Sequence, residues 1–225
     1  MPWTFDMLLH DPGADVLGAD VTHIIRALRQ RSEPTLTAVV ATAAGVSAPR
    51  TRAALKELVS IGVMTLTKVG RANAYTINRT HVAWDGIQLL LDARLLVLRQ
   101  ARRVCEQVAP AGVSIALCAP SGALRGAWER SARFIVVVPE STELRADVIE
   151  GVTRVLRDTV GSMTGNTVAV TFIAEDDLRE RVRNGDKVAK EEWFRSATVH
   201  GPDLSQIILE MTRQTARPTD NPVRT

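Results

Sequence analysis

Apolar and polar positions recur with two different periods in the first third of the chain, and each period predicts a different element. Apolar residues spaced three to four apart over Ala54–Ile61 predict a helix, and an earlier helix over Leu36–Ala44 should end at Gly45. Apolar and polar residues then alternate over Val63–Thr67 and Ala74–Ile77, on either side of a glycine-containing loop. The sequence therefore predicts two helices joined by a glycine turn and followed by a two-stranded hairpin.

Further helical patterns flank this segment on both sides. Val16–Leu28 places apolar residues on one stripe, which should pack under the second helix. After the hairpin, His81–Val108 predicts a helical connector with a break near Trp84-Asp85-Gly86. The apolar face of the connector either packs on the chain's own second domain or forms a dimer interface, and the pattern leaves both open.

Basic side chains gather on the second predicted helix and at the hairpin tip. Between Ser47 and Arg79 the only acidic residue is Glu57, so this segment is far more basic than the whole chain, whose net charge is +3. A basic helix followed by a basic hairpin is typical of a winged helix-turn-helix, whose second helix enters the major groove of DNA. Solvated surface charges are the alternative interpretation. The predicted DNA contacts are Ser47, Arg50, Thr51, Arg52, Lys56, Lys68, Arg71 and Asn73.

The second half of the chain has a different pattern, in which short apolar runs are separated by helical segments. Val113–Leu117, Phe134–Val138 and Val168–Ile173 are each short enough to be a buried strand. Between the second and third runs, apolar residues recur at helical spacing over Leu144–Leu156, which predicts a helix covering one face of the sheet. The second half should therefore be an α/β domain.

Length and composition are those of a soluble globular protein, and the elements predicted in its two halves give an expected fold class of α+β. The 225 residues are 45% hydrophobic and 24% charged, enough for two small cores. We expect residues 1–80 to form the winged helix-turn-helix domain, 81–109 the helical connector, 110–211 the α/β domain and 212–225 a flexible tail. Because no apolar run approaches roughly 18 residues and no signal sequence is evident, we expect a cytoplasmic protein without a membrane partner.

The cysteines and histidines do not predict a metal or redox site. Cys105 and Cys118 are the only cysteines, and such thiols are usually small buried apolar groups in a reducing compartment. The four histidines lie far apart, with no ligand spacing to one another or to the cysteines. We therefore expect no bound metal.

Several segments resemble a minimal nucleotidyltransferase domain of the polymerase-β type. The run Leu117-Cys118-Ala119-Pro120-Ser121-Gly122-Ala123-Leu124-Arg125-Gly126, followed by Ser131–Glu140, is similar to that family's glycine–serine motif and the aspartate-bearing strand after it. Phe172–Leu178 and Ala197–Leu204 are similar to its third strand with the following helix and to its closing helix–glycine motif. The N-terminal part, down to the hairpin exit Tyr75–His81, looks like the winged-helix unit fused to such domains in some bacterial regulators.

The resemblance also implies that the second domain is inactive. In the active family, two aspartates and a further acid on the third strand hold Mg²⁺ ions. One alignment places Ala132 and Phe134 at the aspartate positions, the next places Ser131 and Arg133 there, and Val168–Ile173 contains no acid. The resemblance thus implies no enzyme activity, no catalytic residue and no cofactor. The loop remnants that could bind an anionic effector are Ser121, Gly122 and Arg125.

These observations favour a sequence-specific DNA-binding transcriptional regulator whose second domain senses an effector, dimerises or binds a partner. Its expected partners are double-stranded DNA, a second copy of the chain, and a small anionic effector or a protein. Two alternatives stay open. An active nucleotidyltransferase that modifies protein or RNA would need carboxylates from unusual positions, for which the candidates are Glu129, Glu140, Glu175 and Asp176. An antitoxin-like adaptor would use the helix and hairpin to contact a protein instead of DNA.

Overall fold

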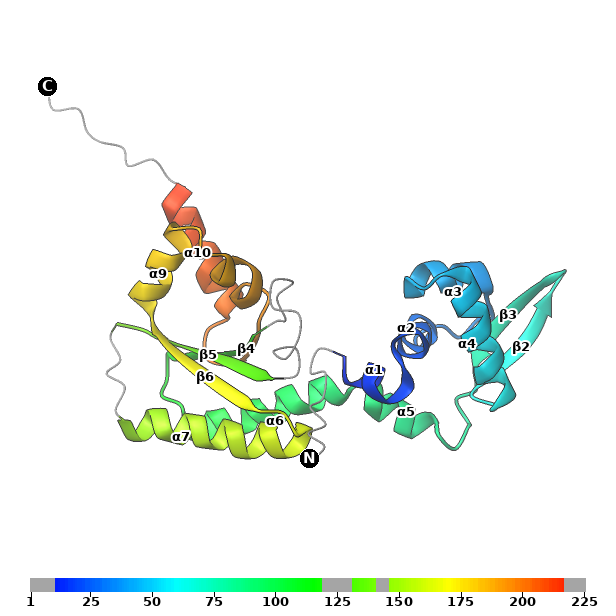
Figure 1. Cartoon of the computed structure of the whole chain (residues 1–225), viewed down its shortest axis with the longest axis horizontal. Helices are drawn as coiled ribbons and strands as arrows, with labels where there is room; N and C mark the ends of the chain where they lie inside the picture. The colour runs from blue at the N-terminus through cyan, green and yellow to red at the C-terminus, as the bar shows by residue number, and fades with distance from the viewer. Residues whose placement is uncertain (1–10, 119–130, 141–145, 217–225) are drawn as a thin grey trace, which may run out of the picture. The chain divides into compact units, whose positions relative to one another are not determined.

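The computed structural model describes residues 11–118, 131–140 and 146–216, which divide into two compact units. The first unit spans Asp11–Arg94, and the second begins at Leu95 (Figure 1). Each unit consists of helices and one sheet, so the α+β class predicted from the sequence is confirmed. The finer domain bounds remain predictions.

The first unit is a set of helices packed beside a small antiparallel sheet. The sheet has the strand order β1-β3-β2, and β2 and β3 form a hairpin in which Met64 lies opposite Ile77 and Val69 opposite Ala72. The predicted pair of helices and the predicted hairpin are confirmed. The elements are α1 (Pro12–Leu17), α2 (Ala19–Leu28), β1 (Thr35–Leu36), α3 (Thr37–Ala44), α4 (Ala48–Ser60), β2 (Met64–Val69), β3 (Ala72–Ile77) and α5 (Trp84–Leu91).

Glycines set the turns of this unit. Gly45 ends α3 with a φ of 65°, a left-handed conformation that a side chain disfavours, and its N–H is bonded to the carbonyls of the last helical turn. Gly70 adopts a φ of 61° at the hairpin tip. Gly18, with a φ of 81°, also interrupts the helix expected over Val16–Leu28, which is therefore two helices, α1 and α2.

The core of the first unit lies between α2, α4 and the hairpin. Ile24 and Leu55 are fully buried, and Tyr75 and Ile77 of β3 complete the same cluster. Burying such side chains contributes roughly 1.5–3 kcal/mol each. The packing holds α4 against β2 and β3, with its other face turned to solvent. The connector helix breaks at Asp92 between α5 and α6, rather than near Trp84 as expected.

The second unit is a four-stranded mixed sheet between two helical layers (Figure 1). The strand order is β6-β5-β4-β7, in which β5 and β6 are parallel and the other neighbours antiparallel. The three predicted strands are confirmed. The elements are α6 (Ala93–Val108), β4 (Ser114–Leu117), β5 (Ala132–Val138), α7 (Ala146–Leu156), the π-helix η3 (Arg157–Gly161), α8 (Ser162–Thr164), β6 (Val168–Ala174), α9 (Glu175–Arg183), the π-helix η4 (Ala189–Trp193), β7 (Ala197–His200) and α10 (Leu204–Ala216).

Each face of this sheet has its own apolar cluster. On one face α6 and α7 pack against β5 through residues that include Cys105, Leu156 and Phe134. On the other face α9, η4 and α10 cover it through Leu178, Leu204 and their neighbours. The helix predicted between the second and third strands therefore does cover one face of the sheet, as expected.

Two expectations for the C-terminal part are wrong. The segment that resembles a closing helix–glycine motif is an edge strand, β7, and Gly201 follows it with a φ of 71°. A Cβ at Gly201 would overlap the carbonyl oxygen of Val113. The close approach of these two backbone segments therefore requires glycine at position 201. The tail was expected to be flexible from Thr212, but α10 continues to Ala216 because Met211 and the preceding turns pack on the sheet.

Candidate functional site

A groove of about 280 Å³ lies between α4 and the β2–β3 hairpin. Six side chains line it, and three of them, Arg52, Lys56 and Asn73, were predicted from the sequence to be DNA contacts. The structure therefore brings predicted residues from the helix and from the hairpin to one place. The remaining lining residues, which sequence reasoning missed, are Val59, Leu66 and Tyr75.

The period of the helix explains why Arg52 and Lys56 share this surface. They lie four residues apart, so they are neighbours on one face of α4, and both are exposed. Leu55 and Leu58 occupy the opposite face and are buried in the core of the unit. Two cations are thus held on the solvent side of a helix that packing has fixed in place.

Arg50 lies two residues before Arg52, closer to the helix N-terminus, and forms an ion pair. Its Nε atom is 2.5 Å from a carboxylate oxygen of Asp20 on α2, and 69% of its side chain is exposed. The Asp20 side chain is 24% exposed, so the pair sits at the surface. Sequence reasoning could not have found this contact, because it joins two helices thirty residues apart in the sequence.

Thr51 is a correction to the predicted contact set. Its side chain is fully buried, and its hydroxyl donates a hydrogen bond to the carbonyl of Val46 at 3.3 Å. It cannot reach a ligand on the solvent side of α4. Thr51 precedes Ala54 and Leu55 by three and four residues and therefore lies on the apolar stripe, a signal that the sequence did carry.

The hairpin presents the other predicted cations. Lys68 and Arg71 are exposed near the tip, and Lys68 lies opposite Asn73 in the β2–β3 register. Leu66 and Val69, both on β2, are also exposed, at 42% and 52%. Ser47, the residue before α4, is exposed and makes no side-chain capping hydrogen bond.

The predicted effector site in the second unit falls outside the described residues, since Ser121, Gly122 and Arg125 all lie within 119–130. Glu129, one of the unusual carboxylates, lies there too. Among the residues that the structure describes, no group of histidine, cysteine and carboxylate side chains could hold a metal ion.

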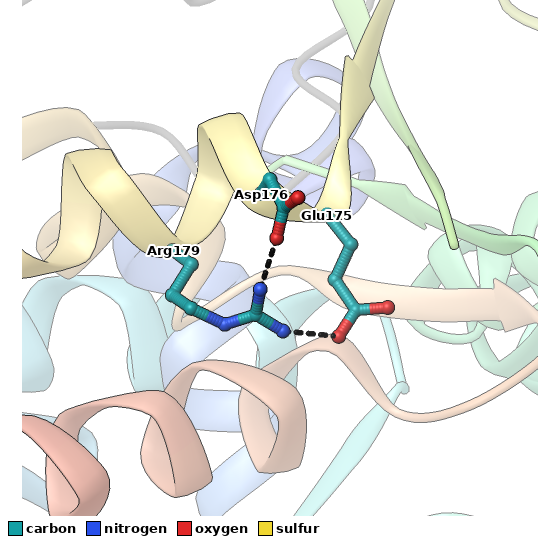
Figure 2. A network of polar contacts seen from close by, with 3 residues as sticks. All are labelled: Glu175, Asp176 and Arg179. Atoms are coloured by element: carbon teal, nitrogen blue, oxygen red, sulfur yellow. Dashed lines mark hydrogen bonds and ion pairs between the residues drawn. The ribbon is translucent and has the colours of Figure 1, made fainter. Parts of the chain in front are cut away.

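The other three unusual carboxylates gather where α9 begins. Glu175 and Asp176 both form ion pairs with Arg179, at 3.1 Å for the Glu175 pair (Figure 2). A hydrogen bond to Asp176 and its negative charge raise the pKa of Glu140 above its usual range. Glu175 and Arg179 also line a pocket of about 330 Å³ beside α10. The positive charge of Arg179 therefore offsets the negative charges of Glu175 and Asp176.

The strand position that the resemblance aligned with a motif aspartate carries a cation. Arg133 on β5 forms an ion pair of 2.7 Å with Glu192 of η4, whose side chain is 2% exposed. The pair fixes η4 against the strand, because separating it would leave a buried charge unpaired. Glu192 was not predicted, since nothing in its sequence neighbourhood indicates burial.

The comparisons with known proteins give little. No protein-family model and no curated protein matches this chain. A solved structure that does match is human N-acetylserotonin methyltransferase in complex with SAM, at 20% identity and a TM-score of 0.28. The match covers 43% of this chain and 33% of the methyltransferase chain, so it spans about a third of that protein.

These findings correct the family identification. No family model and no curated protein of either kind matches the chain, so the identification as a winged-helix regulator fused to a nucleotidyltransferase domain is wrong. The description as a sequence-specific transcriptional regulator with a pseudo-nucleotidyltransferase domain is corrected with it, as are both alternatives. The expectation of a non-enzyme is withdrawn as well, because no comparison supports it. At this TM-score the methyltransferase's own fold and activity are not transferred to the chain.

Proposed function

We propose that the unit Asp11–Arg94 binds double-stranded DNA through α4 and the β2–β3 hairpin. The layout of α3, α4 and the hairpin as a winged helix-turn-helix belongs to this proposal, and so does a cytoplasmic location. The proposal rests on the surface of this unit and not on a family. The observation that carries it is the groove in which Arg52 and Lys56 of the helix meet Asn73 of the hairpin.

The charge of this surface supports a polyanionic ligand. Five exposed cations lie along it, and Glu57 is the exposed acid within α4. Cations that contact phosphates release condensed counterions, which makes binding strong at low salt and independent of base sequence. The cations are Arg50, Arg52, Lys56, Lys68 and Arg71.

The groove also has the composition expected next to a nucleic acid. Asn73 can donate and accept hydrogen bonds, and arginine and lysine donate to phosphates and base edges. The exposed apolar side chain of Leu66 borders them. An α-helix fits the major groove of B-DNA, whereas the deep, narrow major groove of duplex RNA excludes side chains. The surface therefore favours DNA over double-stranded RNA.

No helix in the described ranges is long and apolar enough to cross a bilayer. A membrane surface is nevertheless a second polyanion that a basic helix could meet. The exposed cations of the proposed surface are divided between a helix and a hairpin, with a groove between them, instead of lining one amphipathic helix. This division favours a ligand with grooves and ridges of its own.

The test is binding of the full chain to a labelled DNA duplex, measured by fluorescence anisotropy. Arg52→Ala and Lys56→Ala should each weaken binding about 3–10-fold. A hydrogen bond to a charged group contributes about 1.5–3 kcal/mol, and a contact at the exposed surface contributes less, about 1 kcal/mol. Arg31→Ala, which removes an exposed cation elsewhere in the same unit, should leave affinity nearly unchanged. Equal losses from all three substitutions would contradict the assignment of the surface, and tighter binding to duplex RNA would contradict the choice of ligand.

A further inference from the structure

Most sheet edges in the described part of the chain are protected against pairing with another strand. β1 is two residues long, and β2 carries Lys68. β7 is four residues long, pairs irregularly with β4 and is followed by Gly201-Pro202. Short strands, charged residues and proline are the usual devices that keep an edge from recruiting a second chain.

β6 has none of these devices. It is a seven-residue edge strand, Val168–Ala174, without a charged residue or proline, and among the described strands it pairs with β5 alone. Ala169, Thr171 and Ala174 are exposed, and Phe172 is half-buried. A groove of about 500 Å³ runs beside Thr171, Phe172 and Ile173 on the side of α9. A long, uncharged edge of this kind is a template for another strand.

We propose that a second copy of this chain pairs its β6 antiparallel with this β6, so that two four-stranded sheets join into one of eight strands. The register that pairs the strand over its whole length places Thr171 opposite Thr171 on a two-fold axis. Val170 then lies opposite Phe172, and Ala169 opposite Ile173. Each copy offers the same surface to the other, as a two-fold interface requires.

The sequence around β6 suits this partner better than an unrelated peptide. Opposed residues belong to the same face of the sheet, so the half-buried Val170 and Phe172 cover each other. Ala169 is small and leaves room for the Ile173 of the other copy. The acidic residues that open α9 lie beyond one end of the strand, opposite the uncharged Asn166-Thr167 of the partner, so like charges do not meet.

The test places a charge on the two-fold axis. Thr171→Lys and Thr171→Glu each bring like charges face to face, and Thr171 is exposed, so neither substitution disturbs the core of the unit. The dimer dissociation constant, measured by sedimentation of the full chain, should rise at least tenfold in each variant. An equimolar mixture of the two variants should restore the dimer, because lysine then faces glutamate. Thr67→Lys adds the same charge to an exposed threonine of β2 and should leave the dimer intact.

A second measurement locates the contact directly. Thr171→Cys should be joined to its copy by a short thiol-to-thiol cross-linker, whereas the wild type, whose Cys105 is buried and Cys118 half-buried, should not. A wild type that stays monomeric at the highest attainable concentration would overturn the proposal. So would a dimer that is insensitive to both charged variants, or a mixture that does not recover.

Discussion

The ion pair between Asp20 and Arg50 makes a prediction in which stability and DNA affinity move in opposite directions. Asp20→Asn keeps the size of the side chain but removes its charge from the first turn of α2. Arg50 then loses its partner 2.5 Å away and becomes available to phosphate. An exposed pair contributes about 0.2–1 kcal/mol and an acid near a helix N-terminus about 0.3–1 kcal/mol, so the unit should lose roughly 1 kcal/mol of stability.

Affinity should rise for the same reason. A carboxylate roughly 8 Å from a phosphate repels it by about 0.5 kcal/mol in water, and removing it should tighten binding about 2–5-fold at low salt. If Arg50 gains a phosphate contact, the slope of log affinity against log salt should steepen by about 0.9. Thermal unfolding measures the stability change. Anisotropy titrations at several salt concentrations measure the affinity change and the salt slope.

The matched control is Asp85→Asn, which removes an exposed acid from the first turn of α5 in the same unit. It should cost only the helix-dipole contribution of about 0.3–1 kcal/mol, without changing the salt slope. If Asp20→Asn binds DNA no more tightly than Asp85→Asn, Arg50 does not take part in binding, and the part of the surface nearest the start of α4 is wrongly assigned.

Three further predictions concern the second unit. Gly201→Ala should destabilise this unit by more than ~2 kcal/mol in thermal or urea unfolding. The φ of 71° disfavours a side chain, and a Cβ would overlap the carbonyl of Val113. A change below about 0.5 kcal/mol would contradict this geometry. A hydrogen bond from Ser205 holds the pKa of Asp203 below its usual range, and the backbone N–H of Gln206 also donates to it, so Asp203→Ala should cost about 0.5–2 kcal/mol at neutral pH. Because the folded-state pKa is depressed, that difference should be full above about pH 4 and shrink as pH falls through the folded pKa; a difference that grows on acidification would contradict the assignment. Burial raises the pKa of Cys105 to about 12, so a thiol reagent at pH 8 should label it far more slowly in the native protein than in urea, as mass mapping would show.

Local patterns predicted the elements well because periodicity reports which face of a segment is buried. The stripe through Leu55 and Leu58 and the alternation in the hairpin are properties of a few consecutive residues, and both helix and hairpin formed where expected. Glycine turns such as Gly45 are equally local. The same apolar stripe includes Thr51, so Thr51 should have been left out of the predicted DNA contacts. It was included because its side chain is polar, although the side chain is buried.

Tertiary contacts were beyond sequence reasoning. The pairing of Asp20 with Arg50 and of Arg133 with Glu192 joins residues far apart in the chain, so no local pattern reports it. The mixed order β6-β5-β4-β7, which leaves β6 at an edge, depends on which strands pair, and strand pairing is not encoded in any one strand. Matching short motifs by residue type gave a family that the comparisons overturn, because each motif was too degenerate to specify a fold.

The salt dependence of DNA binding tests the central claim most directly. The affinity of the full chain for a mixed-sequence duplex would be measured between low and physiological salt. If three to five of the exposed cations on α4 and the hairpin contact phosphates, the slope of log affinity against log salt should lie between about −2.7 and −4.5. The double variant Arg52→Ala with Lys56→Ala should make that slope shallower by about 2. Absence of binding at low salt, or a slope that the double variant leaves unchanged, would contradict the proposed function.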